Sequence, residues 1–190
     1  FYRQKQEWDY LIAPNAFSRE IFKSCFMYKD EGDTMLDTGY PRNDLLSDPH
    51  KEEIAIELKK KVGIPLDKKV ILYAVSAGSF EEYRDALISK MRNTIKIFSE
   101  NKNDIMIILY QDKYVEQFCR GIDEELWNQY MDIVGDMMKQ HIGVLYMENG
   151  DIITDDDLVV FVDAYYGDTS DLAHKLNIAG KPVMIQDVNI

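Results

Sequence analysis

The sequence is short of cysteine and of long apolar runs, and each shortage excludes a class of protein. Only two cysteines occur, Cys25 and Cys119, far apart and in apolar helical contexts. This spacing predicts reduced core thiols, with neither a disulfide framework nor a metal site. No apolar run approaches the roughly 20 residues of a membrane span, and the first residues do not have the order of a secretory signal. These features favour a cytoplasmic location. Because no initiator methionine is present, we expect the 190 residues to be part of a longer chain.

Basic residues are outnumbered by acidic ones, 22 to 34, which gives a formal net charge of −12 at pH 7. Nucleic-acid binding depends on clustered lysine and arginine, so this balance argues against a nucleic-acid partner. A phosphorylated small molecule is not excluded, since one cleft can be locally positive on an acidic protein.

Several signatures of nucleotide binding and catalysis are missing. There is no G-x-G-x-x-G fingerprint and no G-x-x-x-x-G-K-[ST] loop, so neither a dinucleotide oxidoreductase nor a P-loop NTPase is supported. No Ser-His-Asp spacing occurs. Of the histidines, only His174 lies near a candidate ligand turn, and its mid-helix position favours a half-buried packing role over a general base. We interpret the aspartate run at 155–157 as a solvated helix start. The alternative, a cluster of carboxylates that binds a metal ion, is less favoured because consecutive helical residues point in different directions. No cofactor is expected.

Strand-like apolar runs alternate with helical patterns along the chain. This order predicts an α/β fold, a Rossmann-like parallel sheet with helices on both faces. Residues 49–190 are expected to form this domain, and residues 1–48 to pack on its core as a strand, a helix and the segment GYPRND. Strands are predicted at 70–77, 105–110 and 144–147, and helices from about Ser18 and over about 83–98 and 123–138.

The stretch 158–188 reads as a βαβ unit. The run LVVFVDAYY (158–166) has no alternation, as expected of a strand buried on both faces, and a Gly/Asp/Ser turn follows it. Residues 171–178 are predicted to be a short helix, which Ala179 and Gly180 end. Pro182 then opens a second strand, PVMIQ.

The turn inside this unit is the first candidate binding site. It places hydroxyls and backbone amides at a helix N-terminus that follows a strand end, where sheets of this class bind ligands and where phosphates are favoured. The simpler alternative is that Thr169 or Ser170 only caps the helix. The polar turn at 76–79 ends another strand, and Lys113 follows a third. The residues expected to bind a phosphate, or a nucleotide that carries one and serves as a donor, are therefore Gly167, Asp168, Thr169, Ser170 and Asp171. Ser76, Ser79 and Lys113 are candidates for further contacts.

At GYPRND (39–44) and VDAYYGDTSDLAHKLNIAGKPVMI (162–185) the chain resembles the CDP-glycerol glycerophosphotransferase family, whose members build teichoic acids and related phosphopolyols. The resemblance implies a GT-B-like architecture of two Rossmann-like domains, of which this chain is similar to the C-terminal, donor-binding half. It further implies that Arg42 lies at the interdomain cleft and that Thr169 and Ser170 hold donor phosphate. Without the resemblance, Arg42 is equally well explained as a surface arginine paired with Asp44.

Two departures from the family pattern bear on activity. Relatives commonly carry a basic-Pro-His-Pro turn after the third strand, whereas this chain has Tyr110, Gln111, Asp112 and Lys113 there. The proposed general base of the family lies in a His-Gly motif of the N-terminal half, which these residues do not include. The catalytic residues are therefore unknown, and the 190 residues alone are expected to be inactive.

The leading hypothesis is the donor-binding domain of a transferase that moves a polyol phosphate or sugar from a nucleotide diphosphate such as CDP-glycerol to a cell-wall or capsular polymer. The polymer would be bound through an N-terminal half, and other parts of the protein would associate peripherally with the inner face of the membrane. One alternative is a catalytically weakened nucleotide-binding or interaction module. A less favoured one is a nucleotide-sugar epimerase-like domain, since its acidic and histidine constellation is not evident.

Overall fold

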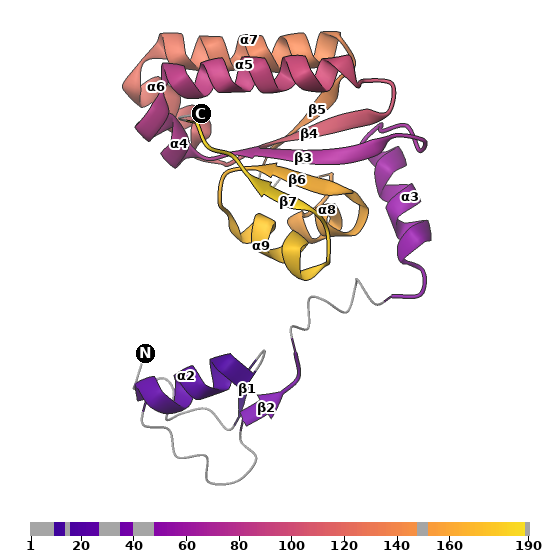
Figure 1. Ribbon diagram of the computed structural model, residues 1–190, viewed down its shortest axis with the longest axis vertical. Helices are drawn as coiled ribbons and strands as arrows, with labels where there is room; N and C mark the ends of the chain where they lie inside the picture. Colours follow the sequence, from indigo (N-terminus) through magenta and orange to yellow (C-terminus); the bar gives the residue numbers. More distant parts are fainter. Residues whose placement is uncertain (1–9, 14–15, 27–34, 40–47, 148–151, 189–190) are drawn as a thin grey trace. The chain divides into compact units, whose positions relative to one another are not determined.

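The computed structural model describes residues 10–13, 16–26, 35–39, 48–147 and 152–188 (Figure 1). The chain divides into two compact units, Phe1–Asp48 and Pro49–Ile190.

The first unit contains a small parallel sheet and one helix. Strands β1 (Leu11–Ala13) and β2 (Met35–Asp37) pair in parallel, with Leu11 opposite Met35. Both of these side chains are buried. Helix α2 (Ala16–Phe26) begins two residues before the predicted start at Ser18. The prediction placed the boundary too late, because Ala16 is a strong helix former and extends the first turn.

The second unit is built on a parallel sheet of five strands within the described residues, in the order β5-β4-β3-β6-β7. The chain adds β4 and β5 on one side of β3, then crosses to the other side to add β6 and β7. The α/β fold with a parallel sheet is therefore confirmed. The strands are β3 (Lys69–Val75), β4 (Ile105–Gln111), β5 (Gly143–Met147), β6 (Ala164–Gly167) and β7 (Val183–Ile185).

Helices cover this sheet on both faces, as the alternating pattern predicted. Figure 1 shows α5 and α7 along one face and α8 and α9 against the other. The helices of the second unit are α3 (Lys51–Lys61), α4 (Ala77–Tyr83), α5 (Asp85–Glu100), α6 (Val115–Ile122), α7 (Glu124–Lys139), α8 (Asp155–Phe161) and α9 (Asp171–Ile178).

The main core lies between the sheet and helices α4 to α7. Because strands of such a sheet are buried on both faces, β3 and β4 are nearly continuous apolar runs. A polar contact inside this core is satisfied, since Tyr130 donates from its hydroxyl to Oε1 of buried Gln111 at 3.0 Å. Cys119 also lies in the core as a free thiol.

The single strand predicted over 158–166 is wrong. Residues 155–161 form α8, and β6 begins only at Ala164. A capping box starts the helix: Thr154 Oγ1 accepts from the Asp157 amide at 3.2 Å, and Asp157 Oδ2 accepts from the Thr154 amide at 2.7 Å. The periodicity of a short apolar run does not distinguish a helix from a strand. Here the capping box at Thr154 and Asp157 favours a helix.

The helix predicted over 83–98 is also divided differently. The structure has α4 and α5 separated at Arg84, which adopts φ 43° and ψ −117°. The segment from Ser76 to Ser79, predicted as a turn, is the start of α4, because Ser76 Oγ accepts from the Ser79 amide at 3.2 Å. Helix α6 was not predicted.

The three aspartates at the start of α8 have separate partners and are not simply solvated. Asp155 accepts hydrogen bonds from the hydroxyls of Tyr110 and Tyr146 at 3.2 and 3.3 Å. Asp156 forms an ion pair of 2.7 Å with Lys175, while Asp157 completes the capping box. Among the described residues, no group of three or more histidine, cysteine or acidic side chains is arranged to hold a metal ion. Nor does that part of the chain contain a helix long and apolar enough to cross a membrane.

Lys181 forms hydrogen bonds at the C-terminal end of α8, and its titration allows the fold to be tested through the pH dependence of stability. Its Nζ donates to the carbonyls of Val159, Val160 and Val162. Burial lowers the pKa of Lys181 from 10.5 to about 8, because the ammonium is partly removed from water. Between these two values the unfolded chain binds a proton that the folded chain has lost. Lys181 should therefore make the unfolding free energy rise with pH across this window, relative to the same chain without this lysine.

We expect the unfolding free energy of the wild type to rise with pH relative to that of Lys181→Met, which has no titrating group at this position. Chemical denaturation at pH values from 7.5 to 10.5 would measure the difference between the two proteins. Lys181→Arg is the matched control, since its side chain stays charged throughout the window and should also lack the rise. Parallel profiles for all three proteins would contradict the assignment.

Candidate functional site

After β3 the next strand is added on one side of the sheet, and after β6 it is added on the other side. A cavity lies between these two strands, at the point where their connections diverge. In open α/β sheets the connections after two such strands diverge and leave a crevice at their carboxyl ends. Here we find an open cavity of ≈1040 Å³, which we call the switch-point cavity. Its lining comes from the last residue of β7 and from the segments after β3, β6 and β7, namely Ser76, Gly78, Ser79, Glu81, Glu82, Tyr83, Asp168, Thr169, Ile185, Gln186, Asp187 and Val188.

Asp168 lines this cavity, but its carboxylate is occupied by protein donors. Oδ2 accepts from the amide and the hydroxyl of Ser76 at 2.7 and 2.9 Å. Oδ1 accepts from Nε2 of Gln186. The Asp168 side chain, which was predicted to bind the nucleotide donor, therefore holds three segments of the protein together.

Gly167 brings the end of β6 against β3. Its φ of 143° disfavours other residues, and a Cβ added here would lie 2.1 Å from the carbonyl oxygen of Ala74. The close approach allows the Asp168 amide to donate to the Ala74 carbonyl at 3.0 Å, and the Gln186 amide to donate to the Gly167 carbonyl at 2.8 Å. Gly167 thus shapes the site without lining the cavity.

Ser170 acts as the N-cap of α9, which is the simpler alternative for this turn. Its Oγ accepts from the Ala173 amide at 3.1 Å and lies 3.0 Å from the hydroxyl of Tyr165. Burial raises the pKa of Tyr165 to about 12, so this hydroxyl stays protonated and also donates to the carbonyl of Asp168. The hydroxyl of Ser170 is therefore already used within the protein.

Thr169 and the first amides of α9 remain candidates for a ligand. Thr169 is exposed and lines the switch-point cavity. Within the described residues, the amides of Asp171 and Leu172 donate no hydrogen bond to another protein group. They lie at the positive end of the α9 dipole, where an anion is stabilised.

The charge of the cavity is acidic. Glu81, Glu82, Asp168 and Asp187 contribute carboxylates, and no lysine or arginine is present among its described lining residues. An anion is therefore favoured only close to Thr169 and the start of α9. The remaining surface suits groups that donate hydrogen bonds, such as the hydroxyls of a sugar or polyol.

Other predicted ligands are not brought to this cavity. Lys113 is exposed with its Nζ 5.1 Å from the centre of the Tyr114 ring, and it does not line the cavity. Asp112 beside it accepts from the Tyr114 amide at 2.7 Å. His174 is exposed on α9 instead of half-buried. Arg42 lies outside the described residues.

Gln186 and Tyr165 were missed by the sequence analysis, although both orient groups at this site. Gln186 is the last residue of the predicted strand PVMIQ, so the rule that ligands lie at strand carboxyl ends was sufficient to find it. Tyr165 lies inside an apolar run, where the sequence does not distinguish a tyrosine whose hydroxyl forms hydrogen bonds from one that only packs in the core.

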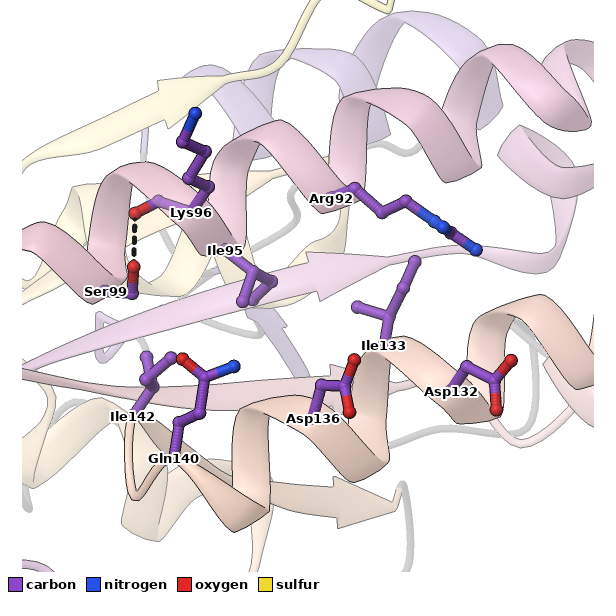
Figure 2. Close-up of a pocket in the computed structure, with 9 residues that line it drawn as sticks. All are labelled: Arg92, Ile95, Lys96, Ser99, Asp132, Ile133, Asp136, Gln140 and Ile142. Carbon is purple, nitrogen blue, oxygen red and sulfur yellow. Dashed lines mark hydrogen bonds between the residues drawn. The ribbon is translucent and has the colours of Figure 1, made fainter.

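A second cavity of ≈540 Å³ lies between α5 and α7 (Figure 2). Arg92 and Lys96 of α5 and Asp132 and Asp136 of α7 line it, together with Ile95 and other apolar side chains, and in Figure 2 the Lys96 side chain points away from α7. The groove lies between helices and not at strand ends, and its charges are mixed. It is therefore a weaker candidate than the switch-point cavity.

Comparisons with known proteins agree on one family. Residues 1–161 match the family model described as CDP-Glycerol:Poly(glycerophosphate) glycerophosphotransferase. A teichoic acid glycerol-phosphate transferase of Staphylococcus aureus is 34% identical over 163 residues, which is 85% of this chain and 40% of the relative. The chain spans less than half the length of the curated relatives that it matches.

Solved structures support the same conclusion. A variant of the wall teichoic acid polymerase TagF, soaked with CDPG, is 25% identical with a TM-score of 0.58, covering 96% of this chain and 38% of that chain. A glycosyltransferase from Rickettsia africae ESF-5 shares the fold at 12% identity and a TM-score of 0.50, covering 93% of this chain and 44% of that chain. The α/β fold is thus similar to TagF and to GT-B glycosyltransferase domains, and the resemblance found in the sequence motifs is confirmed. The chain belongs to the CDP-glycerol:poly(glycerophosphate) glycerophosphotransferase family, whose members include teichoic acid glycerophosphate transferases and polymerases.

Proposed function

We propose that this chain is the donor-binding part of a transferase that moves glycerol phosphate from CDP-glycerol to a polymer, and that the donor binds in the switch-point cavity. One observation carries the proposal: the cavity reaches Thr169, two residues before α9 begins, at the point where the connections after β3 and β6 diverge. Family membership and the CDPG soaked into TagF support the choice of donor.

The donor diphosphate would lie against Thr169 and the amides of Asp171 and Leu172. The acceptor hydroxyl attacks the phosphorus that carries glycerol, the bond to the other phosphate breaks, and cytidine monophosphate leaves as the acceptor loses its proton. Negative charge grows on the leaving phosphate during this step, and fixed amide dipoles stabilise it. Arg42, as the resemblance implies, would add positive charge. The polymer and the general base would come from the rest of the protein.

The acidic part of the cavity would hold the hydroxyl-bearing part of the donor. Glu81 and Glu82 of α4 present carboxylates that accept hydrogen bonds from ribose or glycerol hydroxyls. The same carboxylates disfavour a phosphate placed deeper in the cavity. They therefore orient the diphosphate toward α9.

Replacing Thr169 with valine should weaken CDP-glycerol binding about tenfold, because one hydrogen bond to a charged group is lost at constant side-chain volume. Calorimetric titration of the wild type and Thr169→Val with CDP-glycerol, CDP and UDP measures this loss and identifies the preferred base. Ser99→Ala, which removes a hydroxyl in the groove between α5 and α7, should bind as the wild type does. No heat from the wild type at millimolar nucleotide, or equal binding by Thr169→Val, would overturn the assignment.

A second function, nucleotide binding without transfer, is favoured by the end of β4. Gln111 and Asp112 occupy the place where relatives carry a histidine, and both are used in contacts within the protein. If the complete protein binds CDP-glycerol but releases no cytidine monophosphate in the presence of acceptor polymer, this second function is correct.

A further inference from the structure

We propose that Asp168 is the positioning residue of the switch-point cavity: its carboxylate ties the segments after β3, β6 and β7 together and so aims Thr169 and the start of α9 at one anion. The inference rests on the proposed function, because it assigns how the donor site is held in shape. Asp168 would not contact the donor itself.

The contacts of Asp168 reach across the whole site. Ser76, which donates twice to Oδ2, is 92 residues earlier in the chain, and Gln186, which donates to Oδ1, is 18 residues later. Ser76 is also the N-cap of α4, so the same contact fixes the helix that carries Glu81 and Glu82. One carboxylate therefore joins all three walls of the cavity.

The surrounding hydrogen bonds fix the position of the Asp168 carboxylate. The Asp168 amide donates to Ala74, while its carbonyl accepts from the hydroxyl of Tyr165. On the other side, the Tyr73 hydroxyl donates to Oε1 of Gln186 at 3.4 Å, which turns Nε2 toward Asp168. Thr169 follows directly in the chain, so the position of its backbone is set by these bonds.

This arrangement also explains how an anion site tolerates an aspartate in its wall. A free carboxylate beside a diphosphate would be repelled. Three hydrogen-bond donors from Ser76 and Gln186 spread the charge of the Asp168 carboxylate over polar groups of the protein. The carboxylate can then position the site at little cost to anion binding.

Asp163, at the opposite end of β6, provides a matched control. Its Oδ2 accepts from the Val70 amide at 2.8 Å and its Oδ1 from Lys69 Nζ at 2.9 Å, so it ties the same two strands at their amino ends. Although partial burial opposes it, the hydrogen bonds from Lys69 and Val70 lower the pKa of this carboxyl. Replacing Asp163 should weaken the fold without changing the switch-point cavity.

The test compares four variants in calorimetric titrations with CDP-glycerol, at a temperature where all are folded. Asp168→Ala removes the tie, and Gln186→Glu places two carboxylates against each other. Each should weaken binding about tenfold or more. In the double variant Asp168→Asn/Gln186→Glu the side chain at 168 donates a hydrogen bond and the side chain at 186 accepts it. This variant should recover affinity to within about threefold of the wild type. Asp163→Asn should bind as the wild type does while melting at a lower temperature.

Rescue by the double variant, together with normal binding by Asp163→Asn, supports a positioning role. Equal affinity of Asp168→Ala and wild type, or a loss in Asp163→Asn as large as in Asp168→Ala, overturns it. If the wild type binds no nucleotide, the proposed function fails, and amide hydrogen exchange then decides the inference alone. Exchange at Ser76 and Ala173, whose amides are hydrogen-bonded in the wild type, should speed up in Asp168→Ala and not in Asp163→Asn. Unchanged exchange in Asp168→Ala would contradict the inference.

Discussion

Gly167→Ala should destabilise the second unit by about 4 kcal/mol, the largest loss that we expect from any single methyl group in this chain. The added Cβ would lie 2.1 Å from the carbonyl oxygen and 2.8 Å from the nitrogen of Ala74. Both atoms belong to the backbone of β3, so neither can rotate away. The φ of 143° adds backbone strain for any residue with a Cβ. The strands must separate, and the bonds that join β3, β6 and β7 are lost together.

Gly135→Ala is the matched control for this prediction. Gly135 lies inside α7, and a Cβ there meets no atom within 4 Å. This substitution should stabilise the protein by about 0.5–1 kcal/mol, because alanine favours helix over glycine. Chemical denaturation of the two variants and the wild type gives both values. If Gly167→Ala unfolds at the wild-type denaturant concentration, β6 does not approach β3 as closely as the structure places it.

The sheet could be predicted because its central strands are buried on both faces. The runs at 70–75 and 105–111 are almost entirely apolar, and this pattern carries over directly into β3 and β4. The segment from α9 to β7 was also predicted, with the helix at Asp171–Ile178 and Gly180 beyond its end at φ 73°. Here local turn chemistry and the tertiary structure agree.

The elements that were predicted wrongly are short ones whose limits depend on caps. The run at 158–166 contains no residue that separates helix from strand, and the boundary is set by Thr154 and Asp157 before it. Likewise α4 exists because Ser76 caps it and Arg84 separates it from α5. The polar residues at 76–79 were interpreted as a turn, because a helix cap and a turn use the same residue types.

The predicted turn lies at the switch-point cavity, but the contacts that each of its side chains makes could not be predicted. The turn contains two hydroxyl residues, and sequence alone does not tell which one caps the helix. The structure gives Ser170 the cap and leaves Thr169 at the cavity. Asp168 bonds to Ser76, 92 residues away, and no local pattern predicts a contact at that separation.

Phe80→Ala should destabilise the second unit by about 3–5 kcal/mol and weaken donor binding as well. The ring is fully buried and meets Tyr130 edge to face, with ring centroids 5.4 Å apart and planes at 87°. Its removal leaves a cavity between α4 and α7 that the packed neighbours cannot fill. Phe80 is also the side chain that anchors α4, whose opposite surface carries Ser79, Glu81 and Glu82 along the switch-point cavity.

Phe80→Leu separates these two effects, because it keeps most of the apolar volume and should lose only about 1–2 kcal/mol. We expect its affinity for CDP-glycerol to stay close to that of the wild type, since α4 remains anchored. Denaturation and calorimetric titration of both variants at a temperature below their melting transitions provide the measurements. Loss of stability in Phe80→Ala with unchanged affinity would show that α4 carries no part of the donor site, and Thr169 with the start of α9 would then have to bind the donor without it.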